Sequence, residues 1–298
     1  MTTLETETPH PDHPRLDEYE TRDLVAALID DQELAADAVR RAAAFNTAAV
    51  DAAVPRLEAG GRLIYIGAGT SGRLGLLDSV ELYPTFSWPP ERALALLAGG
   101  RDAIYRAIEG AEDDREQGAQ DLRAINPSPD DVVILLAASG ATPYVMGAVA
   151  AARAAGALTI GIGNNPGAPI ALEAEIGIVL ETGYELISGS TRLKAGTAQK
   201  IVLNTLSSAI MVRLHKVHGN LMVDLMPTNA KLYRRAVALT VRATGADEAT
   251  ARRTLEASGY QVKVAIVAIL RKTDTTAALA ALAAADGSVR RAVAGGGR

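Results

Sequence analysis

Short apolar runs, separated by longer amphipathic stretches, dominate the middle of the chain. Five of these runs have the length of a β-strand, and most of them end in Gly, Ser or Thr. Their near-continuous apolarity is typical of parallel strands covered on both faces, whereas half-exposed strands alternate apolar and polar residues. The predicted strands are residues 62–69, 92–99, 131–139, 158–163 and 176–182.

Helical periodicity fills the segments between these runs, at 72–80, 101–123, 143–155 and 169–174. This alternation predicts an α/β fold with a doubly wound, mainly parallel five-stranded sheet. In such sheets ligands bind outside the carboxyl ends of the strands, which is where this sequence has its Gly, Ser and Thr residues.

Helical patterns also flank the predicted sheet, and they suggest how the chain is organised. We expect a disordered tail (1–15), N-terminal helices (16–58), a sheet-containing domain (59–235) and a small C-terminal helical domain (236–298). A long helix over about 192–216 closes the sheet-containing domain.

Composition narrows the function classes. The 298 residues carry a net charge of −5, which argues against a nucleic-acid-binding protein. The absence of cysteine excludes disulfides and thiolate catalysis. The acidic N-terminus lacks the pattern of a signal peptide, and no apolar segment is long enough to span a membrane, so we expect a soluble cytoplasmic protein.

The first candidate site is the glycine-rich loop Gly67-Ala-Gly69-Thr70-Ser71-Gly72, between a strand and a helix. Its backbone N–H groups and hydroxyls can hold an anion at the helix N-terminus. The loop also matches a dinucleotide fingerprint, but the next strand ends in Ala98-Gly99-Gly100 without the acid that binds the ribose. A tight turn without a ligand remains the structural alternative.

Two further loops repeat the hydroxyl pattern. Ser139, Gly140 and Thr142 follow another strand, with Thr142 as the predicted N-cap of a helix that begins with Pro143. Ordinary helix capping would explain this loop equally well.

The third loop contains Ser188, Ser190 and Thr191 before the long helix. Arg192 and Lys194 fall in the predicted first turn of that helix, where the helix dipole disfavours cations. An anionic ligand or a carboxylate partner would offset this cost.

Two acids are candidates for proton transfer. Glu81 lies between apolar residues, an environment that raises a carboxyl pKa and suits proton donation. Glu112 lies in an acid-rich segment, where a surface role is the ordinary interpretation.

Together these blocks resemble one family. "IGAGTSGRLGLLDSVELYPTF", "AIEGAEDDREQGAQDL", "AASGATPYV", "GSTRLKAGTAQKIVLNTLS" and "NLMVDLMPTNAKL" are similar to signature blocks of the N-acetylmuramic acid 6-phosphate etherases. This family belongs to the sugar isomerase (SIS) superfamily of phosphosugar-binding folds. The resemblance covers nearly the whole chain, from about residue 20 to 270.

The resemblance implies a lyase that cleaves the D-lactyl ether of N-acetylmuramic acid 6-phosphate during recycling of cell-wall amino sugars. The implied mechanism is elimination followed by hydration, which needs two acid/base groups and no cofactor. By resemblance, Glu81 is the catalytic proton donor and Glu112 the second catalytic glutamate. The implied partners are a phosphorylated amino sugar and a second copy of the chain in a homodimer, with no nucleic acid or membrane.

The resemblance also implies which residues hold the substrate. They are the members of the three loops and one lysine: Gly69, Thr70, Ser71, Gly72, Ser139, Gly140, Thr142, Ser188, Ser190, Thr191 and Lys194.

The sequence departs from the family pattern near these residues. Ala141 stands where the family usually has Arg, and His10 takes the place of an Asn in an N-terminal TE-x-x-N motif. Val80 replaces the usual small residue before Glu81, and Leu82-Tyr83-Pro84 replaces the Pro-Pro after it. Two other functions stay open on the same fold, a non-catalytic phosphosugar-binding regulator and an aldose–ketose phosphate isomerase.

Overall fold

The computed structural model describes residues 4–227 and 229–295, and the chain divides into two compact units. Unit 1 comprises the residues up to Val80 together with Pro90–Ser207, and unit 2 comprises Glu81–Pro89 and the residues from Ser208 onward. The C-terminal unit therefore begins before residue 236, where the sequence placed its boundary.

Unit 1 contains one sheet of five parallel strands in the order β2-β1-β3-β4-β5. Its strands are β1 (Leu63–Gly67), β2 (Ala93–Leu97), β3 (Val132–Leu136), β4 (Leu158–Gly163) and β5 (Ile176–Val179). Every residue of β1, β3 and β4 is buried, which explains their continuous apolarity. The predicted parallel sheet is confirmed.

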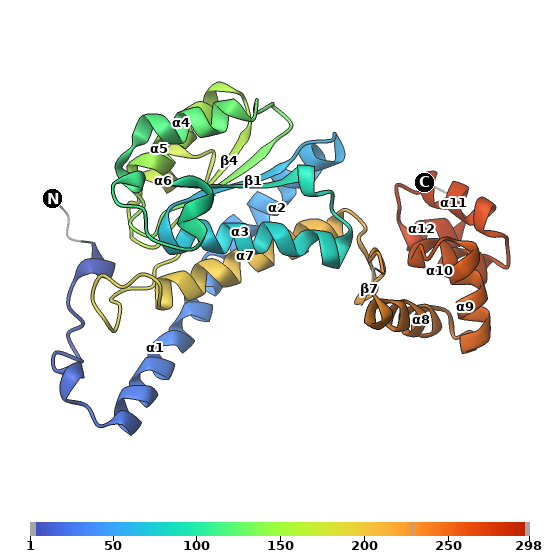
Figure 1. Cartoon of the computed structure of the whole chain (residues 1–298), viewed down its shortest axis with the longest axis horizontal. Coiled ribbons are helices and arrows are strands. Elements are labelled where there is room, and N and C mark those ends of the chain that lie inside the picture. Colours follow the sequence, from blue (N-terminus) through green and yellow to red (C-terminus); the bar gives the residue numbers. More distant parts are fainter. Residues whose placement is uncertain (1–3, 228, 296–298) are drawn as a thin grey trace. The chain divides into compact units, whose positions relative to one another are not determined.

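Helices cover both faces of this sheet (Figure 1). One face carries α4 (Arg115–Ala124), α5 (Pro143–Ala154) and α6 (Pro169–Glu173), and the other carries α2 (Ala43–Glu58), α3 (Gly69–Phe86) and α7 (Lys194–Arg213), with α1 (Thr21–Arg41) leading into α2. On the first face, Val133 and Leu135 pack with Tyr144 and Val149 in one buried cluster. The doubly wound architecture is therefore present as predicted.

The helix expected over 101–123 is shorter than the sequence pattern suggested. Two short 3₁₀ turns, Gly100–Ile104 and Ala111–Asp113, come first, and α4 begins only at Arg115. Gly110, the N-cap residue of the second turn, has a φ of 71°, a left-handed conformation that a continuous helix does not contain. Asp114 then caps α4, because its carboxylate accepts the N–H of Gln117 at 2.9 Å.

The N-terminal residues expected to form a disordered tail are instead packed as part of unit 1 from residue 4 onward. They form two 3₁₀ turns, η1 (Glu5–Glu7) and η2 (Leu16–Glu18), before α1 begins. Thr6 is fully buried and hydrogen-bonds to Asn165. One buried threonine thus fixes a segment whose composition is that of a solvated tail.

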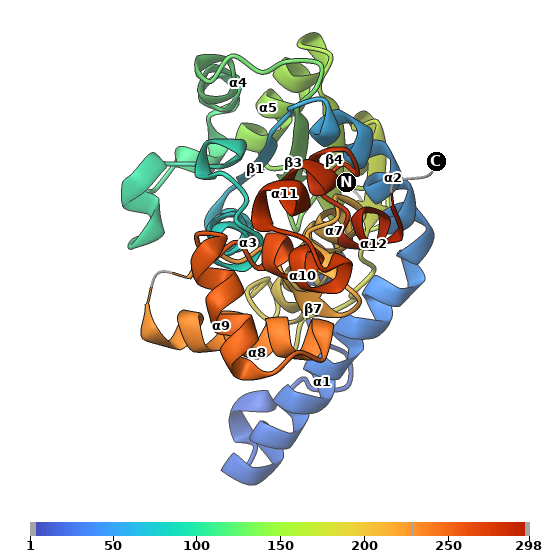
Figure 2. The same ribbon diagram turned by 90° about the vertical axis from the view of Figure 1, so that its right-hand side faces the viewer.

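Unit 2 is a helical bundle with a short β6–β7 hairpin (Val217–His218 and Leu221–Met222). Its helices are α8 (Ala230–Thr244), α9 (Glu248–Ala257), α10 (Val262–Arg271), α11 (Thr275–Ala283) and α12 (Val289–Ala294). Helix α10 lies at the centre and packs against the other four (Figure 2). Within the described residues, none of the helices in either unit has the length and apolar character needed to span a bilayer.

Candidate active site

A cavity of about 420 Å³ lies in unit 1 where the three hydroxyl-bearing loops meet. Ser71 comes from the first turn of α3, Ser139 and Thr142 from the β3–α5 loop, and Thr191 from the loop before α7. The structure thus brings four of the predicted hydroxyls to the carboxyl ends of neighbouring strands, as expected for a doubly wound sheet. The complete lining is Glu7, Ala68, Gly69, Ser71, Glu112, Asp113, Ala137, Ala138, Ser139, Ala141, Thr142, Pro143, Gly189 and Thr191.

The β1–α3 loop is shaped by close backbone packing. A Cβ on Gly72 would lie 2.2 Å from Leu97 Cδ1 and 2.6 Å from the carbonyl oxygen of Gly67, so only glycine fits there. Thr70 and Ser71 stand in the first turn of α3, where backbone N–H groups have no partner within the helix. These N–H groups and the Ser71 hydroxyl suit an anion, whereas Gly72 contributes by packing and does not line the cavity.

The hydroxyls of the β3–α5 loop bond within the loop: Ser139 Oγ accepts the N–H of Ala141 at 3.3 Å and lies 3.5 Å from Thr142 Oγ1. Thr142 is the N-cap residue of α5, but its side chain makes no capping hydrogen bond. The Thr142 hydroxyl is therefore not used for helix capping, and Thr142 lines the cavity together with Ser139. Gly140 serves the turn itself, because its φ is 80° and its carbonyl accepts the N–H of Ile170 at 2.8 Å.

In the loop before α7, some polar residues line the cavity and others form hydrogen bonds elsewhere within the protein. Thr191 lines the cavity, whereas the Ser188 hydroxyl donates to the carbonyl of Glu7 at 2.8 Å. The backbone N–H of Ser190 donates to Ile187, and neither Ser188 nor Ser190 lines the cavity.

The N-terminus of α7 is occupied by buried carboxylates. Glu185 accepts the N–H groups of Lys194 and Ala195 at 2.9 and 2.8 Å, and burial raises the pKa of its carboxyl against the opposing effect of these hydrogen bonds. The Lys194 ammonium pairs with Asp31 of α1, and both side chains are buried. Of the two expected ways to compensate for a cation in this turn, the structure has the carboxylate partner. Lys194 does not line the cavity.

Glu112 lines the cavity from the 3₁₀ turn η5 (Ala111–Asp113) and also lines an adjoining hollow of about 360 Å³. Arg73 of α3 helps to position the far wall of that hollow, because its Nε donates to the carbonyl of Ala103 at 3.0 Å. Glu112 therefore lines both spaces.

Glu81 belongs to unit 2, whereas Glu112 and the cavity belong to unit 1. It lies on an exposed part of α3, and the nearby Val80 and Tyr83 are exposed as well.

The cavity's charge is unusual for an anion site. Its lining, as far as the described residues go, contains the acids Glu7, Glu112 and Asp113 and no Lys, Arg or His. Ala141 lines it at the position where the family usually has Arg. Glu7 was not among the predicted site residues, because its one signal in the sequence is the N-terminal TE motif. Within the described part of the chain, no group of three His, Cys, Asp or Glu residues is placed to hold a metal ion.

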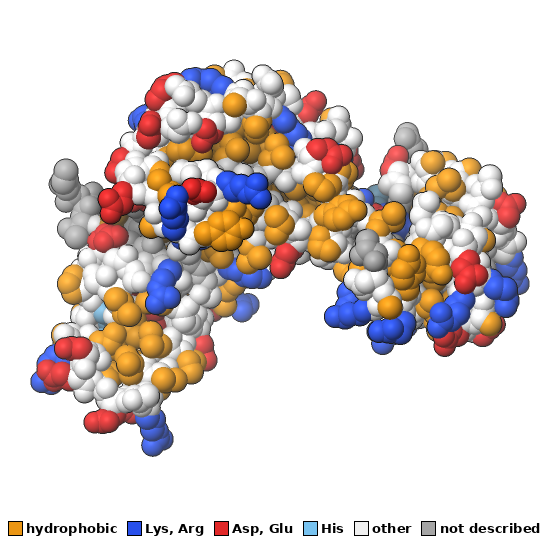
Figure 3. Space-filling view, viewed as in Figure 1, with side chains coloured by type: hydrophobic (Ala, Val, Ile, Leu, Met, Phe, Trp, Pro, Cys, Tyr) orange, Lys and Arg blue, Asp and Glu red, His pale blue; other side chains and the backbone are white. Residues whose placement is uncertain are grey.

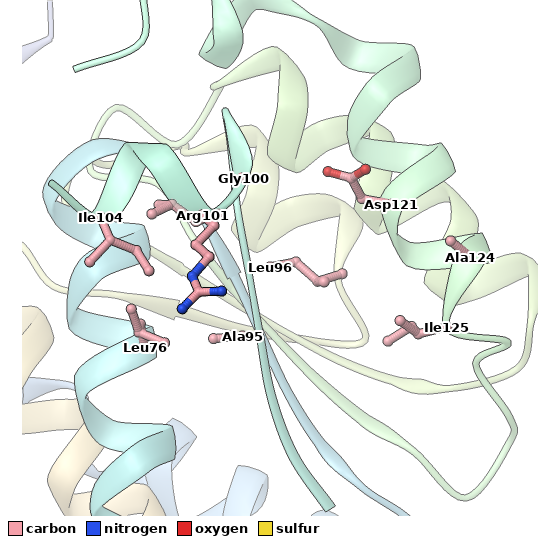
Figure 4. A pocket seen from close by; sticks show the side chains of 10 residues that line it. Leu76, Ala95, Leu96, Gly100, Arg101, Ile104, Asp121, Ala124 and Ile125 are labelled. Carbon is pink, nitrogen blue, oxygen red and sulfur yellow. The ribbon is translucent and has the colours of Figure 1, made fainter. Parts of the chain in front are cut away.

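A larger hollow of about 490 Å³ lies at the edge strand β2 (Figure 4). Leu76 and Arg101 lie on one side of the strand and Asp121 and Ile125 on the other. Asp121 already accepts the Tyr144 hydroxyl at 2.6 Å, and the other lining residues are mostly apolar. This hollow lacks the convergent polar groups of a reaction site.

Comparison with known proteins agrees with the fold. The family description "Glucokinase regulatory protein N-terminal SIS domain" matches residues 46–153, and "C-terminal lid domain of glucokinase regulatory protein" matches residues 219–293. Together with the parallel sheet and the hydroxyl-lined cavity, these matches define an SIS-domain protein.

The relatives define the family within that class. The N-acetylmuramic acid 6-phosphate etherase of Deinococcus radiodurans is 61% identical over 262 residues, covering 88% of this chain and 86% of its own. That of Rubrobacter xylanophilus is 48% identical, covering 99% and 97%. The chain belongs to the N-acetylmuramic acid 6-phosphate etherase family, as the sequence resemblance indicated. A solved phosphoheptose isomerase from Neisseria gonorrhoeae is also similar, at 15% identity over 64% of this chain and 98% of its own, with a TM-score of 0.48.

Proposed function

We propose that this protein cleaves the D-lactyl ether of N-acetylmuramic acid 6-phosphate, giving N-acetylglucosamine 6-phosphate and D-lactate. The observation that carries the proposal is the meeting of four hydroxyl side chains and Glu112 in one cavity at the carboxyl ends of the strands. The etherase name of relatives at 48–61% identity favours this reaction over a phosphosugar isomerase or a non-catalytic regulator. A cytoplasmic location stays a prediction.

The hydroxyl side of the cavity holds the 6-phosphate. Ser71, Ser139, Thr142 and Thr191 offer hydroxyl donors, and the first turn of α3 adds backbone N–H groups. Neutral donors of this kind position a phosphate without an ion pair. The sugar then extends from this end of the cavity toward Glu112.

Glu112 acts on the sugar carbons. Opening of the ring gives an aldehyde, which makes the proton on C2 acidic, and the Glu112 carboxylate removes that proton. Lactate leaves from C3 with a proton from an acid, and water then adds to C3 while a proton returns to C2. A carboxylate that lines the cavity suits this role, because the sugar can place C2 and C3 beside it.

The acid that protonates lactate is Glu81 in the family assignment. Glu81 is exposed on α3, and we propose in addition that the chain forms a homodimer. Helix α1 offers an apolar surface for such a partner: Val25 and Ile29 stand one turn apart and are 49% and 55% exposed. Hydrophobic side chains gather over this part of the chain in Figure 3.

The test is D-lactate release by the purified chain from N-acetylmuramic acid 6-phosphate. We expect lactate from the wild type and at least about 100-fold less from Glu112→Gln, the usual effect of losing a positioned base. Glu116→Gln is a matched control, since Glu116 is an exposed acid of the same segment that lines neither hollow. Sugar-phosphate binding without lactate release from the wild type would refute the etherase function.

A further inference from the structure

The N-terminal segment is tied to the same strand ends that form the candidate site. The backbone N–H of Thr6 donates to Asn165 Oδ1 at 3.3 Å, and Asn165 Nδ2 donates to Thr6 Oγ1 at 3.0 Å and to the carbonyl of Ala138 at 2.9 Å. Asn165 follows β4 and Ala138 follows β3. Both Thr6 and Asn165 are buried, so this contact gives residue 7 a defined place beside the cavity.

Glu7 is held there by a second set of contacts. The N–H of Gly189 donates to the carbonyl of Thr6, and the Ser188 hydroxyl donates to the carbonyl of Glu7, both at 2.8 Å. A Cβ added to Gly189 would lie 2.9 Å from Glu7 Oε2. The Glu7 carboxylate therefore lies directly against Gly189, and both residues line the cavity.

A carboxylate at this position has a clear electrostatic consequence. It can only accept hydrogen bonds, and it repels a phosphate held in the same cavity. No cation compensates for it among the described lining residues. A ligand compensates for this repulsion only if it carries neutral hydrogen-bond donors as well as a phosphate. The hydroxyl groups of a sugar phosphate are such donors.

We propose that Glu7 is a specificity-determining residue that accepts a hydrogen bond from a hydroxyl of the phosphosugar and disfavours phosphates without such donors. The inference rests on the proposed function for the identity of the sugar, but its physical basis is the cavity alone. The segment from Thr6 to Glu7 is thus part of the binding site.

The test compares Glu7→Gln with Glu5→Gln by calorimetric titration against two probes, N-acetylglucosamine 6-phosphate and inorganic phosphate. Glu5 is a matched control, because it carries the same charge on the same 3₁₀ turn and does not line the cavity. We expect Glu7→Gln to weaken sugar-phosphate binding by about 10-fold, the worth of one hydrogen bond to a charged group. Binding of inorganic phosphate should be unchanged or tighter, and Glu5→Gln should match the wild type with both probes.

Parallel losses for the two probes in Glu7→Gln would overturn the proposal, because they would mean that Glu7 only supports the loop. Unchanged binding of both probes would overturn it too. In the lactate assay, Glu7→Gln should raise KM more than it lowers kcat, since the hydrogen bond is present in the ground state as well as in the transition state. A wild type that binds the sugar phosphate but releases no lactate would count against the proposed function alone, because the two titrations report on Glu7 independently of turnover.

Discussion

The family resemblance implies that Lys194 binds the substrate. Replacing Lys194 tests whether it does so or instead stabilises the fold. The ammonium of Lys194 pairs with Asp31, and their side chains are only 3% and 5% exposed. The second carboxylate oxygen of Asp31 has no hydrogen-bond partner among the described residues. Lys194→Met would therefore leave a buried carboxylate without its counter-charge.

The expected loss of stability follows from the burial of this ion pair. Removing one partner of a buried ion pair costs about 3–5 kcal/mol, far more than the loss of an exposed pair. For a unit of roughly 200 residues, each kcal/mol lowers Tm by about 2–4 °C, so we expect a decrease of roughly 6–20 °C. The double variant Asp31→Leu/Lys194→Met removes both charges and should regain most of the lost stability.

The assay is thermal unfolding followed by circular dichroism, together with titration of N-acetylglucosamine 6-phosphate below the transition. Lys200→Met is the control, because Lys200 is an exposed lysine of the same helix, and its unfolding should stay within about 0.5 kcal/mol of the wild type. A Lys194→Met variant with the wild-type Tm and greatly weakened sugar-phosphate binding would refute the reasoning.

Three further changes test other parts of the structure. Ala141→Arg adds a cation to a lining that has none among the described residues, so calorimetry should show about 10-fold tighter sugar-phosphate binding; unchanged affinity would contradict this. Burial alone would raise the pKa of Asp131, but hydrogen bonds from Arg62 and from backbone N–H groups outweigh it and hold the pKa below its usual value. This pair contributes stability above the unfolded-state pKa of about 4 that is lost as pH falls through the lower folded pKa. Asp131→Asn should thus unfold about 1–3 kcal/mol more easily at pH 7, with the difference narrowing in acid denaturation below about pH 4; a pH-independent difference would contradict it. Mixing inactive Glu81→Gln and Glu112→Gln chains should restore up to about a quarter of wild-type activity if each site uses both copies of a two-fold dimer, whereas no restoration would mean that sites are not shared.

The strands were predictable because their surroundings are uniform. Strands β1 and β3 are buried along their whole length, so apolarity alone marks them. The prediction of one helix over 101–123 was wrong for a local reason. Gly110 adopts a left-handed conformation, which the apolar periodicity does not reveal. That break exposes Glu112 in a turn at the cavity, where a continuous helix would have presented it differently.

The residues that follow the strands could be predicted to lie together. The residues placed by contacts between distant parts of the sequence could not. The hydroxyls of Ser71 and Ser139 meet because the topology places neighbouring strands together. Glu7 reaches the same cavity through the contact of Thr6 with Asn165, 159 residues away, which no local pattern encodes. The pairing of Lys194 with Asp31 spans 163 residues and was foreseeable only as an unnamed carboxylate partner.

The proposed reaction in this cavity is elimination of lactate followed by hydration of the product. Its most direct test is the reaction of the wild-type chain with N-acetylmuramic acid 6-phosphate in D₂O, with D-lactate and the hydrogen at C2 of the product both followed by NMR. Removal and return of the C2 proton predicts one D-lactate per turnover and deuterium at C2 of N-acetylglucosamine 6-phosphate. Lactate release with the original hydrogen kept at C2 would contradict the elimination, and the absence of lactate would contradict the etherase function itself.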